Sequence, residues 1–436
     1  MNRRASDPVA GATPPPWVPG NRWDLLEAPT GPPPRIGVVV CHYRQQAALV
    51  RTVAALHRQT LRPVSIVVAD DGSPHAPEVS ALTGPVPVRV VTQPDRGFRA
   101  AAARNRGVAA VDGDVLVMLD ADTVPGPGFL AAMATRLAAG PDVLAVGRRR
   151  HADLSGTAPG EDPAVAPRLP EPAWLTEGYR RTRNLLDARP GDWRLVISAV
   201  LGMHRGLFDD LGGFDERYVG YGGEDWDLAY RAWNNGALLV HEPAAVAWHD
   251  GPDWAGRPGA RAGKDGERLR IAALVPEPGA RAVPLPGAVP DVLADVEPAA
   301  GRTPVELVDS LLVQTHRDVR VRLPGRDPRL DELYRGVADA APWSDDQLRR
   351  ARARLTIRAP LPPDALARAV ALLVGSDLGR VELVGPGAEP WAELGSTRAA
   401  GRARRHGCGL AVAQEREGVA TLPVHPPHRP SSAVAP

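Results

Sequence analysis

Short apolar runs and helical segments alternate through the first third of the chain. Four apolar runs are expected to be strands: Ile36–Cys41, Val64–Ala69, Val86–Val91 and Val115–Leu119. Continuous apolar character is typical of strands buried on both faces of a parallel sheet. Ala47–Gln59, with apolar residues at helical spacing, and Ala100–Ala110 are expected to be helices. This alternation predicts an α/β layered domain with a mostly parallel sheet.

One irregular segment precedes the alternating pattern, and a proline-rich segment interrupts it farther along the chain. Residues 1–34 predict an extended arm, with Trp17 and Trp23 as candidates for docking on the body. Residues 151–192 are rich in proline and less regular, which favours a mobile or substrate-covering insertion. The first domain is therefore expected to span residues 35–255.

The chain beyond this domain is expected to hold a second, smaller α/β domain. Residues 256–302 are low in periodicity and rich in Gly, Pro and Ala, which predicts a linker. Periodicity resumes over residues 303–422, and the composition of residues 423–436 predicts a disordered tail.

Part of the second domain aligns with the first. Thr303–Val321 matches Ala48–Ile66, with six identical pairs: Val50/Val305, Val53/Val308, Leu56/Leu311, Gln59/Gln314, Thr60/Thr315 and Arg62/Arg317. Farther along, Leu355–Leu373 aligns with the stretch from Asp120 to Leu137, and Arg402 aligns with Arg231. The shared order of these matches favours a degenerate internal repeat. An unrelated α/β or helical appendage is the alternative.

Composition narrows the class of protein. The chain has 436 residues, 44% hydrophobic and 24% charged, and its 52 basic and 51 acidic residues leave a net charge of +1. This balance argues against a dedicated nucleic-acid binder. Two cysteines, Cys41 and Cys408, provide neither a disulfide framework nor metal-ligand spacing. Without an apolar signal-peptide core or a membrane-length apolar stretch, the expected location is cytoplasmic, with peripheral attachment to the inner membrane face as an alternative.

Two aspartates follow the fourth apolar run. Asp120 and Asp122 are separated by one residue, so their carboxylates can direct oxygens at one divalent cation. Mg²⁺ and Mn²⁺ prefer such oxygens and share them with phosphates. A solvated turn is the alternative, and it is the commoner meaning of an isolated Asp-x-Asp.

Two more polar clusters fall at the same expected sheet edge, where open α/β sheets bind ligands. Asp70 and Asp71 follow the second run and could accept hydrogen bonds from a nucleobase or ribose, although Asp-Gly is also a common turn. Gly97–Gly107 combines small residues with Arg99 and Arg104, which could reach a diphosphate. A surface helix with solvated arginines is the alternative for this segment.

Later segments add a carboxylate pair and a histidine. Gly220–Asp227 surrounds Glu224 and Asp225 with glycines and aromatics, which suits a sugar acceptor, and one carboxylate could deprotonate an attacking hydroxyl. The alternative is a helix N-terminus at which the acids only favour the helix dipole. His249 follows the strand-like Ala237–Val240, and an isolated histidine is more often structural.

Together the Asp-Asp-Gly-Ser, Ala-Arg-Asn-x-Gly, Asp-Ala-Asp and Gly-Gly-Glu-Asp motifs and the late histidine resemble family-2 glycosyltransferases of the GT-A fold. The resemblance covers about residues 35–255. It is closest to members with a Gly-Gly-Glu-Asp segment, such as bacterial chondroitin polymerases and the galactosyltransferase-like C-terminal module. It implies a GT-A (Rossmann-like) domain that uses a nucleotide-sugar donor, for preference a UDP-sugar.

The resemblance also implies roles for the donor-side residues. Asp71, with Asp70, would bind the uracil or ribose, and Arg104 would lie near the nucleotide. Asp120 would contact the ribose or a metal, Mn²⁺ or Mg²⁺.

The remaining implied roles concern the metal and the acceptor. Asp122 would ligate the metal and His249 would complete its site. Asp225 would be the general base and Glu224 would hold the acceptor. A single base without a covalent nucleophile gives inversion at the anomeric centre.

In the second domain, other residues stand at the positions that align with the candidate site residues of the first domain. The alignment pairs Asp70 and Asp71 with Gly325 and Arg326, Asp120 and Asp122 with Thr356 and Arg358, and Glu224 and Asp225 with Gly395 and Ser396. An arginine where a cation should bind repels that cation. We therefore expect residues 303–422 to act as a scaffold, an acceptor-binding module or a dimerising module.

Two other classes stay open. One is a non-catalytic nucleotide- or carbohydrate-binding pseudoenzyme, and the other is a nucleotidyltransferase, although its usual Gly-rich loop with a lysine does not follow the first strand. A dehydrogenase is disfavoured because no Gly-x-Gly-x-x-Gly follows that strand. The expected partners are the donor, a carbohydrate, lipid-carrier or metabolite acceptor, and a second copy of the chain through the C-terminal domain, with no nucleic acid.

Overall fold

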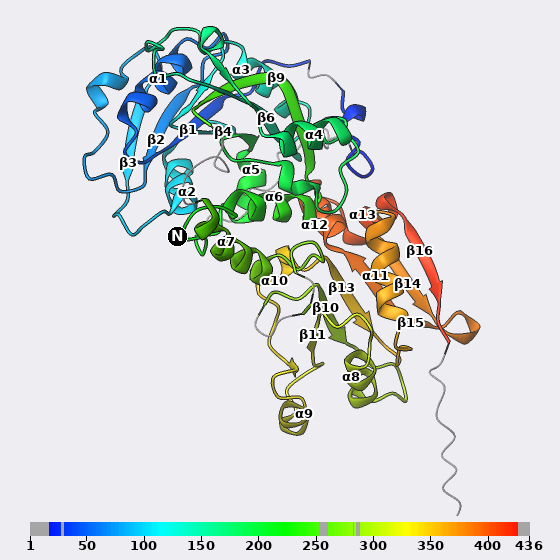
Figure 1. Ribbon diagram of the computed structural model, residues 1–436. Helices are drawn as coiled ribbons and strands as arrows, with labels where there is room; N and C mark the ends of the chain where they lie inside the picture. The colour runs from blue at the N-terminus through cyan, green and yellow to red at the C-terminus, as the bar shows by residue number, and fades with distance from the viewer. Residues whose placement is uncertain (1–16, 28–29, 253–259, 282, 285–287, 426–436) are drawn as a thin grey trace, which may run out of the picture. The chain divides into compact units, whose positions relative to one another are not determined.

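The computed structural model describes residues 17–27, 30–252, 260–281, 283–284 and 288–425 (Figure 1). The chain divides into two compact units. The N-terminal unit comprises residues 15–233 and 237–271, and the C-terminal unit comprises residues 234–236 and 272–436.

The N-terminal unit is built on one mixed sheet with the order β3-β2-β1-β4-β8-β6-β9-β5, and β7 pairs with β6. Its strands are β1 Ile36–His42, β2 Ser65–Asp70, β3 Val88–Thr92, β4 Val115–Asp120, β5 Thr123–Pro125, β6 Val143–Ala152, β7 Arg168–Leu169, β8 Val200–His204 and β9 Leu238–Asp250. Strands β3, β2, β1 and β4 are parallel. Strand β8 runs antiparallel to β4 and β6, and β9 runs parallel to β6.

Helices fill the connections of this sheet. They are α1 Gln46–His57, α2 Ala100–Ala110, α3 Phe129–Leu137, α4 Ala173–Arg181, α5 Arg205–Leu211, α6 Glu224–Asn234 and α7 Ala260–Leu274. The α/β layered class predicted from the sequence is confirmed, with each of the four apolar runs forming a strand. The strand-like Ala237–Val240 is the beginning of the much longer β9, which reaches Asp250.

Small residues bring α2 close to the sheet. Its alanines Ala100–Ala103 are buried, and a Cβ added to Gly107 would lie 2.4 Å from Val39 Cγ1. A larger residue would therefore push the helix away from β1. This close approach holds the N-terminal end of α2 next to the carboxyl ends of β1 and β2.

The described part of the N-terminal arm docks on its own unit through a polar anchor. The Asn21 side chain donates to the carbonyls of Leu185 and Leu239 at 2.6 and 2.8 Å, and its Oδ1 accepts from the Leu239 N–H at 2.8 Å. The Arg136 guanidinium lies 4.9 Å from the centroid of the Trp23 ring. The expected docking therefore uses Asn21 as well as the aromatic residue.

The C-terminal unit holds a second mixed sheet with the order β12-β11-β10-β13-β15-β14-β16. Its strands are β10 Val292–Val296, β11 Val319–Arg322, β12 Ala338–Asp339, β13 Ala353–Ile357, β14 Arg380–Val384, β15 Pro390–Ser396 and β16 Val419–Pro423. Its helices are α8 Pro304–Leu312, α9 Pro328–Leu333, α10 Asp345–Arg350, α11 Ala365–Gly375, α12 Thr397–Arg405 and α13 Leu410–Glu417. The core contains side chains from β10, β13 and α11.

The predicted linker is wrong. Residues 256–302 contain the whole of α7 and of β10, and β10 lies between β11 and β13 inside the second sheet. Strand β10 is only five residues long and is surrounded by Gly, Pro and Ala, so it gives little pattern along the chain. At the other end, Val424 is buried and its N–H donates to the Val384 carbonyl, while residues 426–436 of the expected tail lie outside the described part.

The two sheets share one strand order and one set of directions. In each, four parallel strands are followed by an antiparallel strand, a strand antiparallel to that one, and a strand parallel to its neighbour. The first sheet has two additional strands, β5 beside β9 and β7 beside β6. Strands β10, β13, β15, β14 and β16 thus take the places of β1, β4, β8, β6 and β9.

This order corrects part of the sequence alignment. Gly395 and Ser396 lie on β15, which takes the place of β8, and not on a counterpart of α6. Arg402 lies on α12, which follows β15 as α5 follows β8, so its match with Arg231 is also wrong. Weak similarity in sequence rich in alanine and arginine produced these matches, and only strand pairing separates them from true equivalents.

Candidate active site

The polar clusters of the first sheet meet at the carboxyl ends of its parallel strands. Asp70 ends β2, Asp120 ends β4, and Asp122 follows two residues later. Strand pairing sets Cys41 of β1 beside Asp120, and His42 beside Asp70. The parallel topology therefore brings residues from distant parts of the sequence to one edge.

Asp70 organises the turn after β2. Its Oδ1 lies 2.8 Å from His42 Nδ1 and accepts from the Ser73 hydroxyl at 2.6 Å, and its Oδ2 accepts from the Ser73 N–H at 3.1 Å. Its side chain is fully buried. These bonds hold the loop in shape, so Asp70 supports the loop at the edge of the site.

Asp71 is held by the segment before α2. Its Oδ1 accepts from the Gln93 side chain at 2.5 Å and its Oδ2 accepts from the Arg99 N–H at 2.7 Å. Burial raises the pKa of Asp71 above its usual value, against the lowering effect of these two bonds. The Arg99 side chain points toward Glu216, with 4.0 Å between Nη2 and Oε2.

Arg104 joins two carboxylates that are far apart in sequence. Its Nη2 donates to Asp120 Oδ1 at 2.9 Å and its Nη1 donates to Glu224 Oε1 at 3.0 Å. The guanidinium is buried, whereas a third of the Asp120 side chain is exposed. Arg104 therefore fixes the relative position of β4 and the start of α6, with each of its two terminal nitrogens donating to a carboxylate.

Asp122 and His249 form the pair expected at a metal. Pairing of β5 with β9 sets Thr123 beside His249, and His249 Nε2 lies 3.7 Å from Asp122 Oδ2. Gln45 donates to the same Oδ2 at 3.0 Å. Within the described residues, no group of three or more His, Cys, Asp and Glu side chains gathers as a metal site. The protein thus brings together two candidate ligands.

A cavity of about 480 Å³ opens beside these residues. Its lining includes Arg104, Asp120, Glu224 and Asp225. Aromatic side chains from separate segments complete its walls: Phe98, Trp174, Tyr221 and Trp226. They form two pairs, with ring centroids 5.5 Å apart for Phe98–Tyr221 and 6.3 Å apart for Trp174–Trp226. Flat apolar faces next to carboxylates can pack against a sugar ring and bind its hydroxyls.

Asp225 lies in the first turn of α6, and its pKa is raised above the usual value of an aspartate. Its Oδ1 accepts from the Trp226 N–H at 2.8 Å and its Oδ2 accepts from the Ser198 N–H at 3.4 Å. Burial, followed by the negative charge of Glu224, raises the pKa of Asp225 to about 7. A carboxyl with this pKa can accept a proton at neutral pH, as a general base must.

Glu224 has one committed oxygen and one that has no partner. Oε1 accepts from Arg104, whereas Oε2 is buried without a hydrogen-bond partner among the described residues. An unpaired buried carboxylate oxygen is costly, and such a cost is common at functional sites. Glu224 lies in the cavity lining, where a ligand could supply the missing donor.

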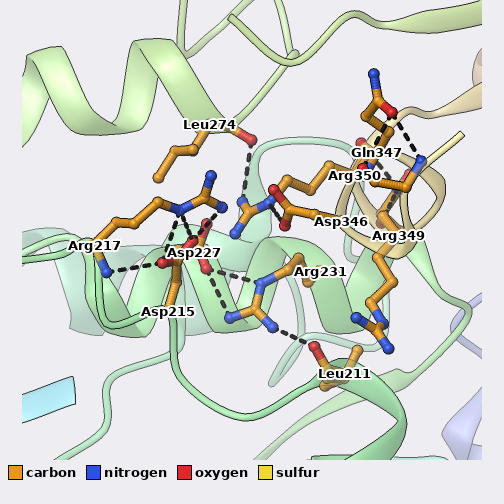
Figure 2. Close-up of polar contacts among 12 residues, drawn as sticks. Leu211, Asp215, Arg217, Asp227, Arg231, Leu274, Asp346, Gln347, Arg349 and Arg350 are labelled. Atoms are coloured by element: carbon orange, nitrogen blue, oxygen red, sulfur yellow. Dashed lines mark hydrogen bonds and ion pairs between the residues drawn. The ribbon is translucent and has the colours of Figure 1, made fainter. Parts of the chain in front are cut away.

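The helix that carries this acidic pair is anchored at its middle and end. Arg231 donates from Nε to Asp227 Oδ2 at 2.8 Å and from Nη1 to the Leu211 carbonyl at 2.6 Å (Figure 2). The Arg231 and Asp227 side chains are almost completely buried. Because the ion pair links successive turns of α6 and ties the helix to the end of α5, the first turn is held rigidly.

The sequence-predicted residues fall into three groups in the structure. Asp120, Glu224, Asp225 and Arg104 share one cavity, and Asp122 lies against His249. Asp70, Asp71 and Arg99 belong to the loop beside them. Sequence reasoning missed Gln45, Gln93, Phe98 and Trp174, because glutamines and single aromatics give no signal of their own, whereas Tyr221 belongs to the predicted Gly220–Asp227 segment. Trp174 lies in the insertion that was expected to cover a substrate.

Comparison with protein families places two models on this unit. Residues 37–212 match the model of glycosyl transferase family 2. Residues 188–244 match a model described as the N-terminal domain of galactosyltransferase. The second match includes β8, α5, α6 and the start of β9. None of the helices in the described ranges combines the length and apolar character needed to cross a bilayer.

Several curated glycosyltransferases share this half of the chain. Hyaluronan synthase of Pasteurella multocida is 26% identical over 240 residues, which are 50% of this chain and 24% of that protein. Validoxylamine A glucosyltransferase of Streptomyces hygroscopicus subsp. limoneus is 28% identical over 224 residues, 48% of this chain and 49% of that protein. Pre-mycofactocin glycosyltransferase of Mycobacterium tuberculosis is 32% identical over 223 residues, 51% of this chain and 44% of that protein.

The matches thus span between about a quarter and a half of each of these relatives. They fall on the unit that contains the cavity, the Asp122–His249 pair and Asp225. The N-terminal unit of this chain is thus similar to the glycosyltransferases of family 2.

Proposed function

We propose that this chain transfers a sugar from a nucleotide-sugar donor, for preference a UDP-sugar, to an acceptor hydroxyl with inversion. The observation that carries the proposal is the arrangement at one sheet edge. A carboxylate–imidazole pair, Asp122 and His249, lies on one part of the edge. A buried carboxylate with a raised pKa, Asp225, lies in a cavity that also contains Asp120.

The residues at Asp122 fit a divalent cation, Mn²⁺ or Mg²⁺. Asp122 Oδ2 and His249 Nε2 are 3.7 Å apart. Neighbouring ligands of an octahedral ion with bonds of about 2.1 Å are about 3 Å apart, so a small closure brings both onto one ion. Two protein ligands leave positions for water and phosphate oxygens, the usual arrangement for such ions at phosphate sites. When bound, the cation would offset the negative charge that develops on the leaving diphosphate.

The acceptor step is assigned to α6 and to the aromatic walls. The acceptor oxygen forms a bond to the anomeric carbon as the bond from that carbon to the diphosphate oxygen breaks. Asp225 takes the proton of the acceptor hydroxyl, and Glu224 Oε2 accepts a hydrogen bond from a second hydroxyl. With no enzyme nucleophile in the pathway, the single displacement inverts the configuration.

A test measures nucleotide release and product formation with a panel of nucleotide sugars in the presence of Mn²⁺. Replacing Asp122 with Asn, or Asp225 with Asn, should lower turnover by at least about a hundredfold, the scale on which a positioned base or charge contributes. Asp187→Asn is the matched control, because Asp187 is exposed and pairs with Arg183 away from the cavity. Full transfer by the Asp225→Asn chain would overturn the assignment of the base.

The other two classes predict different products in the same assay. A pseudoenzyme would bind the nucleotide without releasing it from the sugar. A nucleotidyltransferase would release pyrophosphate from a nucleoside triphosphate. Either result would contradict sugar transfer.

We also propose that the C-terminal unit is a duplicated copy of the first that has lost its donor site. Matching hydrogen bonds support the duplication. Gln59 donates to the Gly126 carbonyl and accepts from the Leu130 N–H. Gln314 donates to the Pro362 carbonyl and accepts from the Leu366 N–H.

Two further pairs of backbone bonds repeat in the same way. Thr60 N–H donates to the Pro127 carbonyl, as Thr315 N–H does to the Pro363 carbonyl. Arg205 N–H donates to the Asp114 carbonyl, as Thr397 N–H does to the Arg352 carbonyl. A shared strand order arises readily in α/β proteins, but the same side-chain clamp at the same junction requires equivalent loops as well.

Arginines occupy the equivalent edge in the second unit. Counted from the matching bonds at Asp114 and Arg352, the counterpart of Asp120 is Arg358 and not Thr356, the residue given by the sequence alignment. Arg358 pairs with Glu297 at 3.7 Å. Asp295 at the end of β10 accepts from Trp343 Nε1 at 2.9 Å and from Arg322 at 2.6 Å. The acidic groups of this edge are thus neutralised by neighbouring cations, which favours a structural or partner-binding role.

A further inference from the structure

A second cavity lies next to the catalytic cavity in the N-terminal unit. It has a volume of about 240 Å³, enough for one sugar ring or a small anion. Arg149 and Ile197 line both cavities. Helix α4 also serves both, with Trp174 facing the first cavity and Tyr179 facing the second. A ligand bound at Asp225 would therefore extend past Arg149 into the second cavity.

Positive charge dominates this second cavity. Its lining contains three arginines, Arg148, Arg149 and Arg180, and one carboxylate, Glu171. Arg148 pairs with Glu171 at 3.1 Å. Arg180 pairs with Glu177, which is not part of the lining, and three quarters of the Arg180 side chain is exposed. Guanidinium groups bind carboxylate and phosphate oxygens through paired hydrogen bonds, so this wall is built to receive an anion.

A buried histidine adds a polar group to the same wall. The His241 ring is only 4% exposed and stacks on the Tyr179 ring with centroids 3.6 Å apart. His241 Nδ1 lies 2.8 Å from Asn184 Oδ1, so Nδ1 carries the hydrogen and Nε2 is left as an acceptor. Nε2 is buried with no hydrogen-bond partner in the described ranges. Burial, and then the charge of Arg148, lowers the pKa of His241 to about 3, which keeps the ring neutral.

We propose that this second cavity is an acceptor subsite that binds the anionic group of an acidic sugar, with the carboxylate or phosphate held by Arg148 and Arg180 and a hydroxyl donating to His241 Nε2. The proposal rests on the proposed glycosyl transfer, because it identifies the occupant as part of the acceptor. It assigns the acceptor to the acidic glycans and sugar phosphates. A neutral sugar would bring no negative charge to a lining in which one carboxylate faces three arginines.

The test measures binding to the full-length chain without donor or metal, by isothermal titration with matched probes. Methyl β-glucuronide carries a carboxylate, glucose 6-phosphate carries a phosphate, and methyl β-glucoside is neutral. At least one acidic probe should bind about tenfold or more tightly than the glucoside, and the advantage should shrink as salt is added. The two acidic probes identify whether the site takes a carboxylate or a phosphate. Equal binding of all three probes would overturn the proposal.

Substitutions of lining residues test whether the probes bind in the second cavity. Arg148→Ala and Arg180→Ala should each remove most of the preference for the acidic probe. His241→Phe, which keeps a ring for Tyr179, should weaken the acidic and neutral probes alike. Arg183→Ala is the matched control, because Arg183 is an exposed arginine in an ion pair with Asp187 and lies outside the lining. An unchanged preference in the Arg180→Ala chain, whose exposed side chain is not needed for folding, would place the anion elsewhere.

Failure of this subsite and failure of the proposed transfer give different results. If the chain releases nucleotide with Mn²⁺ but shows no preference for acidic probes, only the subsite is wrong. If acidic probes bind and depend on Arg148 but no sugar is transferred, only the activity is wrong.

Discussion

At the scale of single residues, the site depends on how buried charges are paired. Arg104 is surrounded by Asp120 and Glu224, and its two hydrogen bonds connect β4 with α6. Removing one partner of such a set leaves the other charges buried and uncompensated, which costs more than the bond itself contributes. Arg104 is therefore a positioning residue, and Asp225 is the general base that we propose.

The pH dependence of turnover should report Asp225. Because the pKa of Asp225 is raised to about 7 by burial and by Glu224, the base is mostly protonated below that pH. Turnover at saturating Mn²⁺ should rise about tenfold per pH unit below pH 7 and level off above it. Glu224→Gln removes the like charge while keeping an oxygen for Arg104, so the midpoint of this rise should move to lower pH.

The control for the pH profile of turnover is a variant outside the cavity. Asp187→Asn, in an exposed ion pair, should leave the midpoint in place. A midpoint that stays near 7 in both Asp225→Asn and Glu224→Gln chains would mean that another group titrates.

At the scale of elements, the hydrogen bonds of the Gln59 and Gln314 side chains give the strongest support for the proposed duplication. Gln59 and Gln314 each follow the first helix of their unit and reach across to the loop before a later helix. Both side chains are buried. Each satisfies a carbonyl and an N–H that would otherwise be buried without a partner.

Replacing either glutamine with alanine should destabilise the chain. Each lost bond to a buried backbone group costs about 1–3 kcal/mol, so both variants should unfold at clearly lower denaturant concentration. Arg58→Ala, an exposed change next to Gln59, should have little effect. The two glutamine variants should behave alike if the units are copies, and an unaffected Gln314→Ala chain would contradict that equivalence.

At the scale of the whole molecule, one unit keeps the acidic groups at its sheet edge and the other pairs them with arginines. In the first unit Asp122 lies with His249, whereas in the second Arg358 lies with Glu297 and Arg322 with Asp295. A divalent cation needs a carboxylate that is not already neutralised by an arginine, and the bound cation in turn attracts the diphosphate. Only the first edge offers such a carboxylate within the described residues.

Titration of the full-length chain with UDP and Mn²⁺ should therefore find one nucleotide per chain. Asp122→Asn should abolish this binding altogether, because Asp295 and Glu297 at the second edge are already paired with arginines. A stoichiometry of two, or a metal-dependent site that survives in the Asp122→Asn chain, would show that the C-terminal unit also binds a donor.

The sequence by itself determined the α/β class and most of the acidic site. Strands β1, β2 and β4 are buried on both faces, so their residues must be continuously apolar, and this pattern is visible without a structure. The carboxylates stand at strand ends because parallel strands direct their carboxyl ends to one edge. Asp120 and Asp122 could be named for this reason, and Asp225 because it belongs to the Gly-Gly-Glu-Asp segment.

Only the tertiary structure decided what each group contacts and where the second unit begins. Strand β10 is too short to be seen among Gly, Pro and Ala, yet neighbours on both sides make it a central strand. Asp122 and His249 come together from segments more than a hundred residues apart. The raised pKa of Asp225 is caused by burial and by the neighbouring charge of Glu224. Such effects depend on distance and exclusion of water, which local sequence patterns do not encode.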